Sequence, residues 1–317
     1  MTLERLVLCR PEGGLNDMLC QIEAAYAYAE KSDRVVVVDT NYRNARAFKD
    51  KLSTYFSSRS DRLILDSDAI EDRIDAMTVF PEYLFGRLST YKLDWGTVVS
   101  NWCDSETGSR LSFDFDEIYT EQILLHHACG GGQASLKALS RLQLRDAVID
   151  LLEQRIDAIG QSFSAIHIRN TDYKTDYRSQ LEGLKGRVHL PVFVATDDSA
   201  CREYCIELFG KESVRYFSSL PEESGVPLHA EYLHTSVFIR NSEAILDLLM
   251  LALATDFFKI SLSPNAHHAT YSGFSLLAEN LKNAPDILAA LIGSSAKGRS
   301  ILERIAAWRR ESVRRHA

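Results

Sequence analysis

The segment 167–172, with the sequence His-Ile-Arg-Asn-Thr-Asp, holds the side chains best suited to bind a phosphate group. It ends the apolar stretch 164–169, which is typical of a buried strand. Strand ends in α/β sheets face the ligand crevice, and a guanidinium is a planar fork of donors that fits phosphate oxygens without a metal. Arg169 is therefore a candidate for binding a diphosphate. The alternative is an ion pair between Arg169 and Asp172 that closes the loop.

Two acids, Asp197 and Asp198, end the apolar run that starts at Pro191, and a helical pattern over 199–209 follows at once. Paired carboxylates can bind a divalent metal, exchange protons or cap a helix. Because the helix begins directly after them, we expect at least one of them to cap it.

Asp247 lies in the segment 244–254, which is apolar on every side of a helix and therefore predicts a buried one. A lone buried carboxylate is costly unless donors reach it. The edge of a guanine ring offers an adjacent N–H and NH2, a matched pair of donors. The alternatives are a structural ion pair and an acid in the first helical turn near Asn241 and Ser242.

Two turns hold further candidates. Residues 261–265, Ser-Leu-Ser-Pro-Asn, follow a strand pattern and precede a helical pattern, where hydroxyls and free N–H groups can hold a phosphate. An ordinary helix cap fits equally well. Residues 12–17, Glu-Gly-Gly-Leu-Asn-Asp, match neither dinucleotide nor P-loop glycine motifs. Their glycines would admit a sugar closely, with Glu12, Asn16 or Asp17 in reach, or they form a tight turn capped by Asn16 or Asp17.

Metal and nucleophile motifs are missing from the sequence. The pairs His126-His127 and His267-His268 are adjacent and would point apart on a helix, and neither an HExxH motif nor a zinc-like Cys/His spacing occurs. No GxSxG elbow is present. We therefore expect no bound metal and no cofactor.

Composition limits the partners and the location. A net charge of −8 argues against a general nucleic-acid binder. The most apolar run, 244–254, is about half of a ~20-residue membrane span, and the charged N-terminus does not resemble a signal peptide. Six cysteines without a CxxC pair or a dense framework indicate reduced thiols in a cytoplasmic protein.

The pattern of elements predicts an α/β fold with two Rossmann-like domains, whose parallel sheets face across a cleft. We expect an N-terminal domain at 1–158, a C-terminal domain at 159–298 and a basic amphipathic helix at 299–317. In the first half, expected strands are 5–10, 34–39, 62–66, 77–80 and 97–102, and expected helices are 17–31 and 135–159. In the second half, strands are expected at 164–169, 191–197, 214–218 and 257–262, and helices at 199–209, 242–254 and 267–280.

The last helix is expected at 300–315, with one apolar face and one basic face. The basic face holds Arg304, Arg309, Arg310, Arg314 and Arg315. Cations suit the C-terminal end of a helix, so a solvated face is one interpretation. A peripheral contact with a membrane surface or an anionic partner is the other.

Taken in order, these segments resemble the nodulation-type fucosyltransferases and, more distantly, the eukaryotic core fucosyltransferases that add α-1,6-linked fucose. The resemblance covers about residues 3–280 and rests on the segments 3–17, 24–29, 35–39, 167–172, 195–198, 225–231, 242–247 and 261–265.

The resemblance implies a GT-B fold and an inverting, metal-independent transfer of fucose from GDP-fucose to a glycan acceptor, with the N-terminal domain on the acceptor side. It implies that Arg169 holds the diphosphate, Asp247 the guanine edge, and Ser263 with Asn265 the β-phosphate side. It also implies that His167 shapes the nucleotide pocket. The remaining donor-binding candidates are Asp172, His229, Gly13, Gly14 and Asn16.

The chain departs from the family pattern at two places. Asn170 stands where the family often has a second arginine. The acid expected as catalytic base has two candidates: Asp176 is near in spacing, and Glu12 resembles an acid that protein O-fucosyltransferases use at a similar turn. Two other functions stay open: transfer from a different nucleotide sugar, and non-catalytic binding of a nucleotide sugar.

Overall fold

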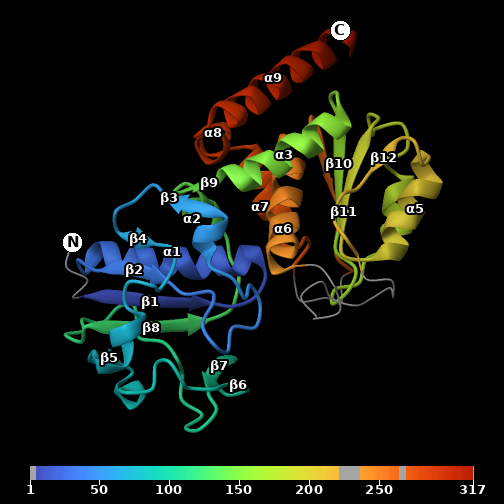
Figure 1. Cartoon of the computed structure of the whole chain (residues 1–317). Helices are drawn as coiled ribbons and strands as arrows, with labels where there is room; N and C mark the ends of the chain where they lie inside the picture. Colours follow the sequence, from blue (N-terminus) through green and yellow to red (C-terminus); the bar gives the residue numbers. More distant parts are fainter. Residues whose placement is uncertain (1–4, 221–235, 264–268, 317) are drawn as a thin grey trace. The chain divides into compact units, whose positions relative to one another are not determined.

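The computed structural model describes residues 5–220, 236–263 and 269–316. The chain divides into two compact units, residues 1–145 and 146–317 (Figure 1). Within the described ranges, no helix is both long enough and apolar enough to cross a bilayer.

The unit boundary differs from the one expected at 158/159. Helix α3 (Asp146–Ile159) belongs to the second unit, because its buried face packs against α6 (Val237–Leu253) and α9 (Ala296–His316). Helix α9 also packs on α8 (Pro285–Ile292), so the C-terminal helix is part of the second unit and not a separate segment.

The first unit is built on a five-stranded parallel sheet with the order β4-β2-β1-β8-β5 (Figure 1). Both faces of this sheet are covered, so its central strands are continuous apolar runs. Leu6, Leu8 and Val37 face one core cluster, and the alternate residues face the other side. The strands are β1 (Leu6–Pro11), β2 (Val35–Val38), β4 (Leu63–Ile64), β5 (Val79–Phe80) and β8 (Ile123–Ala128). Helix α1 (Leu15–Lys31) follows β1, as the sequence predicted.

Smaller elements complete the first unit. Two antiparallel pairs are β3 (Phe56–Ser58) with β9 (Leu142–Leu144), and β6 (Leu93–Gly96) with β7 (Asn101–Asp104). The remaining elements are the short helices η1 (Leu52–Thr54), η2 (Glu71–Ala76), η3 (Glu82–Leu84) and α2 (Ser135–Leu139).

Three expectations for the first unit are wrong. The single helix expected at 135–159 is α2, β9 and α3, because Leu142–Leu144 pairs with β3. The strand expected at 97–102 is the turn and second strand of the β6–β7 hairpin. His126 and His127 lie in the buried strand β8 and not on a helix.

The second unit is built on a four-stranded parallel sheet with the order β12-β11-β10-β13. Figure 1 shows α5 on one side of this sheet and α6 with α7 on the other. The strands are β10 (Ser164–Ile168), β11 (Val192–Thr196), β12 (Val214–Arg215) and β13 (Asp256–Lys259), and the remaining helices are α4 (Tyr177–Glu182), α5 (Ser199–Phe209) and α7 (Gly273–Lys282). This order, in which the first strand lies between the second and the fourth, is that of a Rossmann half.

The basic face of α9 is less solvated than its sequence suggests. Arg309 turns inward and donates to the last carbonyls of α6, those of Ala252, Leu253 and Ala254, at 3.3, 3.0 and 3.1 Å. These carbonyls lack partners within α6, so Arg309 caps that helix. Arg304 forms an ion pair with Asp157 on α3 at 2.7 Å.

Candidate functional site

The chain connections reverse direction between β10 and β13 in the second sheet. Ligands of open α/β folds bind outside the carboxyl ends of the strands at such a point. The structure places Arg169 and Asp172 directly after β10, and Ser263 shortly after β13. The Ser263 N–H donates to the Lys174 carbonyl at 2.8 Å, which ties the two loops together. The other predicted residues, His229 and Asn265, lie outside the described residues.

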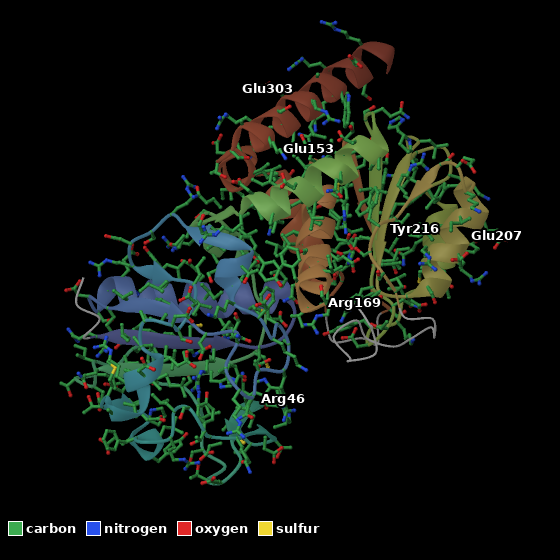
Figure 2. All side chains as sticks on the ribbon, viewed as in Figure 1. Arg46, Glu153, Arg169, Glu207, Tyr216 and Glu303 are labelled. Carbon is green, nitrogen blue, oxygen red and sulfur yellow. The ribbon has the colours of Figure 1, made fainter. Side chains whose placement is uncertain are left out.

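Arg169 is held at this edge by two carboxylates. Its Nη1 lies 3.1 Å from Asp197 Oδ2, and its Nη2 lies 2.7 Å from Asp172 Oδ2. The ion pair with Asp172 that the sequence left as an alternative is therefore present. Burial would raise the pKa of Asp172, but the hydrogen bond and charge of Arg169 outweigh it and hold that pKa below its usual value. The Arg169 side chain remains 27% exposed, and Figure 2 shows it at the end of the sheet.

The two acids after β11 organise the loop that carries Arg169. Asp198 caps α5 by accepting from the Ala200 N–H at 2.9 Å, which confirms the expected cap. Buried Asp197 accepts from the Asn170 N–H at 2.8 Å and the Thr171 hydroxyl at 2.6 Å. Asp197 therefore fixes both the backbone after β10 and the guanidinium.

Asn170 has a structural position in the same network. Its Nδ2 donates to Asp198 Oδ2 at 2.8 Å, and its Oδ1 accepts from the N–H and hydroxyl of Thr175 at 3.0 and 3.1 Å. The side chain is buried, so an arginine there would displace this set of hydrogen bonds. At the position where the family often has a second arginine, the side chain of Asn170 therefore holds the loop after β10 in place.

His167 lies in β10 and is buried. Its Nδ1 lies 2.6 Å from the Ser275 hydroxyl at the start of α7, and its ring lies 5.2 Å from that of Phe274. Burial, and then the charge of Arg169, lower the pKa of His167 to about 3. The imidazole is therefore neutral at neutral pH and links the sheet edge to α7.

Asp176 caps α4, with its side chain accepting from the Ser179 N–H at 3.4 Å. Its carboxylate is on the surface of the second unit. Asp176 thus lies exposed at the end of the loop that begins with Arg169, and its role as a base stays a prediction.

Asp247 forms the ion pair that the sequence left as an alternative. Its Oδ1 accepts from Arg155 Nη1 on α3 at 2.6 Å and from the Ser218 hydroxyl at 2.8 Å. Burial raises the pKa of Asp247, and Arg155 and Ser218 oppose that rise. Arg155 was not among the residues predicted from the sequence. It occupies a buried position on the same face of α3 as Leu152 and Ile159, a signal that could have identified it.

A cavity of about 300 Å³ lies beside this ion pair, between α3 and the first half of α6. The hydroxyl of Ser242 lines it, is buried and has no hydrogen-bond partner among the described residues. Glu243 also lines it and accepts from the Ser219 N–H at 3.2 Å, and burial raises its pKa. The lining residues are Leu151, Gln154, Arg155, Ala158, Phe217, Ile239, Ser242, Glu243 and Leu246.

The first sheet has its own switch point, between β1 and β8. The glycine turn follows β1 there and packs against the glycines after β8. Gly13 has a φ of 102°, and a Cβ on it would lie 2.9 Å from Asp17 Oδ2, so glycine is required by the turn itself. Asn16 is buried and accepts from the Ser135 hydroxyl at 2.7 Å. Gly14 precedes α1 as its N-cap residue.

Glu12 lies at the same edge, buried in a polar network. Its Oε1 accepts from the Tyr42 hydroxyl and from the Arg46 N–H at 3.0 Å, and its Oε2 accepts from the Ala47 N–H at 3.1 Å. Burial would raise the pKa of Glu12, but the neighbouring His127 and the hydrogen bond from Tyr42 lower it below its usual value. Glu12 is therefore a firmly held carboxylate, and a catalytic role for it stays a prediction.

Sequence reasoning missed the partners of Glu12. His127 lies 3.0 Å from the Tyr42 hydroxyl through Nε2 and 2.6 Å from the Tyr91 hydroxyl through Nδ1. Arg10 pairs with Asp39 at 2.8 Å behind the two tyrosine rings. These residues come from separate segments, so no local pattern brings them together.

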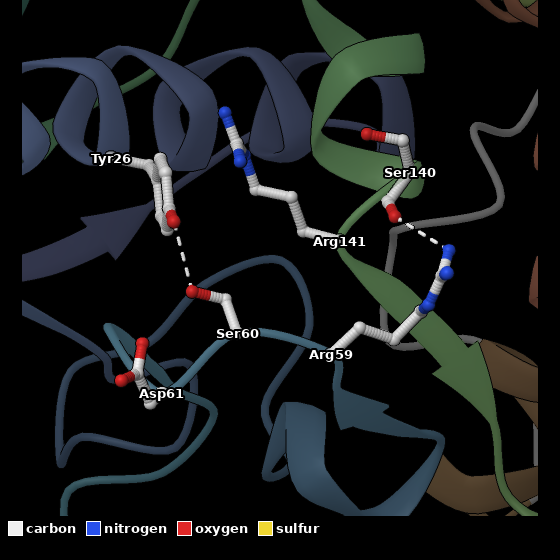
Figure 3. A pocket seen from close by; sticks show the side chains of 6 residues that line it. All are labelled: Tyr26, Arg59, Ser60, Asp61, Ser140 and Arg141. Atoms are coloured by element: carbon white, nitrogen blue, oxygen red, sulfur yellow. Dashed lines mark hydrogen bonds between the residues drawn. The ribbon is translucent and has the colours of Figure 1, made fainter.

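A polar cavity of about 570 Å³ lies at the opposite edge of the first sheet, where the chain enters β4 (Figure 3). Figure 3 shows its internal hydrogen bonds, from Arg59 to the Ser140 carbonyl and between the hydroxyls of Tyr26 and Ser60. Arg141, which also lines it, pairs with Glu23 at 2.9 Å. The cavity includes none of the predicted site residues.

Among the described residues, no group of three or more His, Cys, Asp or Glu side chains is placed to hold a metal ion.

No protein-family model and no curated protein matches the chain. Solved structures do match it. The fucosyltransferase NodZ from Bradyrhizobium superposes with a TM-score of 0.56 at 17% identity, over 88% of this chain and 93% of that one. A NodZ alpha-1,6-fucosyltransferase co-crystallised with GDP gives 0.54 at 18%, over 88% and 92%. POFUT1 without ligand gives 0.54 at 12%, over 90% and 97%.

At these identities the likeness concerns the fold. The expected class, a GT-B fold of two Rossmann-like α/β domains, is confirmed, and so is the fold-level resemblance to NodZ-type fucosyltransferases.

Proposed function

We propose that this chain is an inverting glycosyltransferase that transfers fucose from GDP-fucose to a glycan acceptor without a metal. The observation that carries the proposal is the position of Arg169, a partly exposed guanidinium at the switch point of the second sheet. The fold adds support, because the similar NodZ structure was co-crystallised with GDP.

In the proposed reaction, Arg169 binds the diphosphate of the donor. Asp197 is buried and keeps the guanidinium in place, whereas Asp172 is more exposed and can give up its hydrogen bond to phosphate oxygens. The acceptor hydroxyl oxygen attacks the anomeric carbon, the bond from that carbon to the diphosphate oxygen breaks, and GDP leaves with the electron pair. Arg169 stabilises the charge that develops on the leaving group.

A carboxylate must take the proton of the acceptor hydroxyl. Asp176 is the better supported candidate, because it is exposed and its carboxylate accepts one long hydrogen bond, at 3.4 Å, from the Ser179 N–H. Glu12 accepts three hydrogen bonds and has a lowered pKa, which makes it a weaker proton acceptor. We therefore assign the base to Asp176, and to Glu12 the positioning of the loop that holds Tyr42 and Arg46.

The cavity between α3 and α6 is the proposed guanine pocket. Its volume of about 300 Å³ lies at the lower end of the range for ligand sites. Glu243 lines it and can present acceptor oxygens to the N–H groups of guanine. Asp247, one helical turn further along α6, is not among the lining residues and is paired with Arg155.

The six cysteines are all free thiols. This supports the proposal that the protein works in a reducing, cytoplasmic setting.

Turnover of GDP-fucose in EDTA tests the reaction. The wild type should hydrolyse or transfer fucose, Arg169→Ala should lose most of this activity, and Arg178→Ala, an exposed arginine on α4, should keep it. GDP-mannose as donor tests the specificity for the transferred sugar, and UDP-sugars test the specificity for the nucleobase of the donor. Activity that EDTA abolishes, or that survives the loss of Arg169, would contradict the proposal.

A further inference from the structure

The β6–β7 hairpin of the first unit presents two tryptophans side by side. Trp95 and Trp102 are directly opposite each other in the antiparallel register. Their ring centres are 5.3 Å apart and their planes are perpendicular, at 90°. Trp95 is 48% exposed, which leaves a large part of an indole in water. Tryptophan is enriched at contact surfaces, so this partly exposed pair of indoles is a candidate for one.

The hairpin is anchored, so the indoles are held in place before any ligand arrives. The side chain of Asn101 forms two hydrogen bonds with the backbone of Cys129. Its Nδ2 donates to the Cys129 carbonyl at 2.8 Å, and its Oδ1 accepts from the Cys129 N–H at 3.0 Å. At the end of β7, buried Asp104 accepts from Arg87 at 3.2 Å and from Thr107 at 3.0 Å. A surface fixed in this way loses little conformational entropy on binding.

Arg46 joins the hairpin to the switch point of the first sheet. Its guanidinium carbon lies 4.7 Å from the centre of the Trp102 ring, and it has no carboxylate partner among the described residues. Its backbone N–H donates to Glu12 Oε1 at 3.0 Å. One residue therefore connects the indole pair with the carboxyl end of β1. Trp102 adds a buried indole N–H that has no acceptor in the described part of the chain.

We propose that Trp95, Trp102 and Arg46 form the acceptor subsite and that its ligand is a neutral carbohydrate. The C–H bonds on one face of a pyranose ring carry small positive charges, which suit the negative face of an indole. The hydroxyls at the ring edge accept hydrogen bonds from a guanidinium that lacks a carboxylate partner. That the bound sugar is the acceptor rests on the proposed function. That the site binds a sugar rests only on the geometry of the hairpin.

The chemistry of the patch favours a sugar over a protein partner. The exposed apolar residues of the patch are Trp95 and Val98, which lies in the turn. The residue before Trp95, Asp94, is also exposed and is acidic. A stable protein interface buries roughly 800 Å² on each partner and has an apolar core, which is far more than one indole and one valine supply.

Tryptophan fluorescence in a Trp308→Phe background tests the subsite, since the chain has three tryptophans and the other two lie in the hairpin. The probes are tetrasaccharides of glucose, galactose, mannose and N-acetylglucosamine, each titrated to millimolar concentration. At least one should shift the emission saturably. Trp95→Ala and Arg46→Ala, followed by calorimetry, should each weaken its binding about tenfold, the size of one aromatic or charge-assisted contact.

Ile118→Ser is the matched control, because Ile118 is an exposed apolar residue elsewhere in the first unit. It should leave sugar binding unchanged. Arg46→Ala keeps the backbone N–H that holds Glu12 and loses the contact with Trp102 and one long hydrogen bond to the Leu93 carbonyl, so its melting temperature should fall by only a few degrees. The inference is overturned if none of the four sugars binds, or if Trp95→Ala binds as the wild type does.

GDP titration of the same variants separates this inference from the proposed function. Trp95→Ala should bind GDP like the wild type. If the wild type binds a sugar but no GDP, the proposed function fails and the carbohydrate site stands.

Discussion

The ion pair between Arg155 and Asp247 gives a prediction whose size follows from the structure. The two side chains are 8% and 13% exposed, and Asp247 is the carboxylate that Arg155 contacts within the described residues. Asp247→Asn removes the carboxylate that pairs with that guanidinium and leaves it two neutral acceptors, the asparagine side-chain oxygen and the Ser218 hydroxyl at 3.4 Å. Removing one partner of a buried pair costs about 3–5 kcal/mol, and we expect about 3 kcal/mol because asparagine still accepts a hydrogen bond.

Urea unfolding measures this cost. The reporter is Trp308 in α9, which packs on the helix that carries Arg155, with Trp95 and Trp102 replaced by phenylalanine. With a slope of about 2 kcal/mol per M, the transition midpoint should fall by roughly 1.5 M. The double variant Arg155→Met, Asp247→Leu should recover most of the loss, because apolar residues of similar size replace buried pairs at little cost.

The exposed ion pair between Lys297 and Asp150 provides the control. It also joins α9 to α3, and its side chains are 55% and 47% exposed. Asp150→Asn should cost less than about 0.5 kcal/mol. The interpretation of Asp247 as a brace between α3 and α6 fails if Asp247→Asn costs no more than Asp150→Asn, or if the double variant is no more stable than the single one.

Three further predictions concern the loop, the histidines and the last helix. Asn170→Ala should lower stability by about 1–3 kcal/mol by chemical denaturation, because Asp198 and Thr175 lose partners, whereas Ala at exposed Asn283 should change little. Burial lowers the pKa values of His126 and His167 to about 3, below the ~6.5 of the unfolded chain, so the unfolded state binds more protons between these values and stability should fall as the pH falls. Each histidine should lower the free energy of unfolding by about 2 kcal/mol between pH 7 and pH 5. A variant that lacks one of them should lose that part of the dependence of stability on pH, whereas His189→Gln on the surface should keep it. Arg309→Met should cost about 1–2 kcal/mol by thermal unfolding because α6 loses its cap, and equal loss in exposed Arg310→Met would contradict that role.

The sequence predicted the second unit well because its signals are local. The apolar runs of β10 and β11 end in polar residues, and Asp198 directly precedes its helix, so strand, cap and helix can be identified without tertiary contacts. The position of Arg169 directly after a buried strand was predicted for the same reason, and its role in binding stays a prediction.

The first unit was predicted less completely because several of its elements depend on distant partners. Strand β8 contains two histidines just before its last residue, Ala128, and histidines look polar in sequence. His126 bonds Ser112 and Gln21, and His127 bonds two tyrosines, so both can be buried in a central strand. Strand β9 interrupts a helical pattern because β3, more than 80 residues earlier, offers it backbone partners. The local sequence therefore predicts neither the burial of the two histidines nor the strand pairing of β9.

Calorimetric titration of GDP, UDP and ADP in EDTA tests the central claim most directly, with Arg169→Ala beside the wild type. We predict that GDP binds most tightly and that the loss of Arg169 weakens it about a hundredfold, as expected for two charge-assisted hydrogen bonds of about 1.5 kcal/mol each. Equal affinities for the three nucleotides, or an unchanged GDP affinity in Arg169→Ala, would contradict the assignment of this sheet edge to a guanine nucleotide.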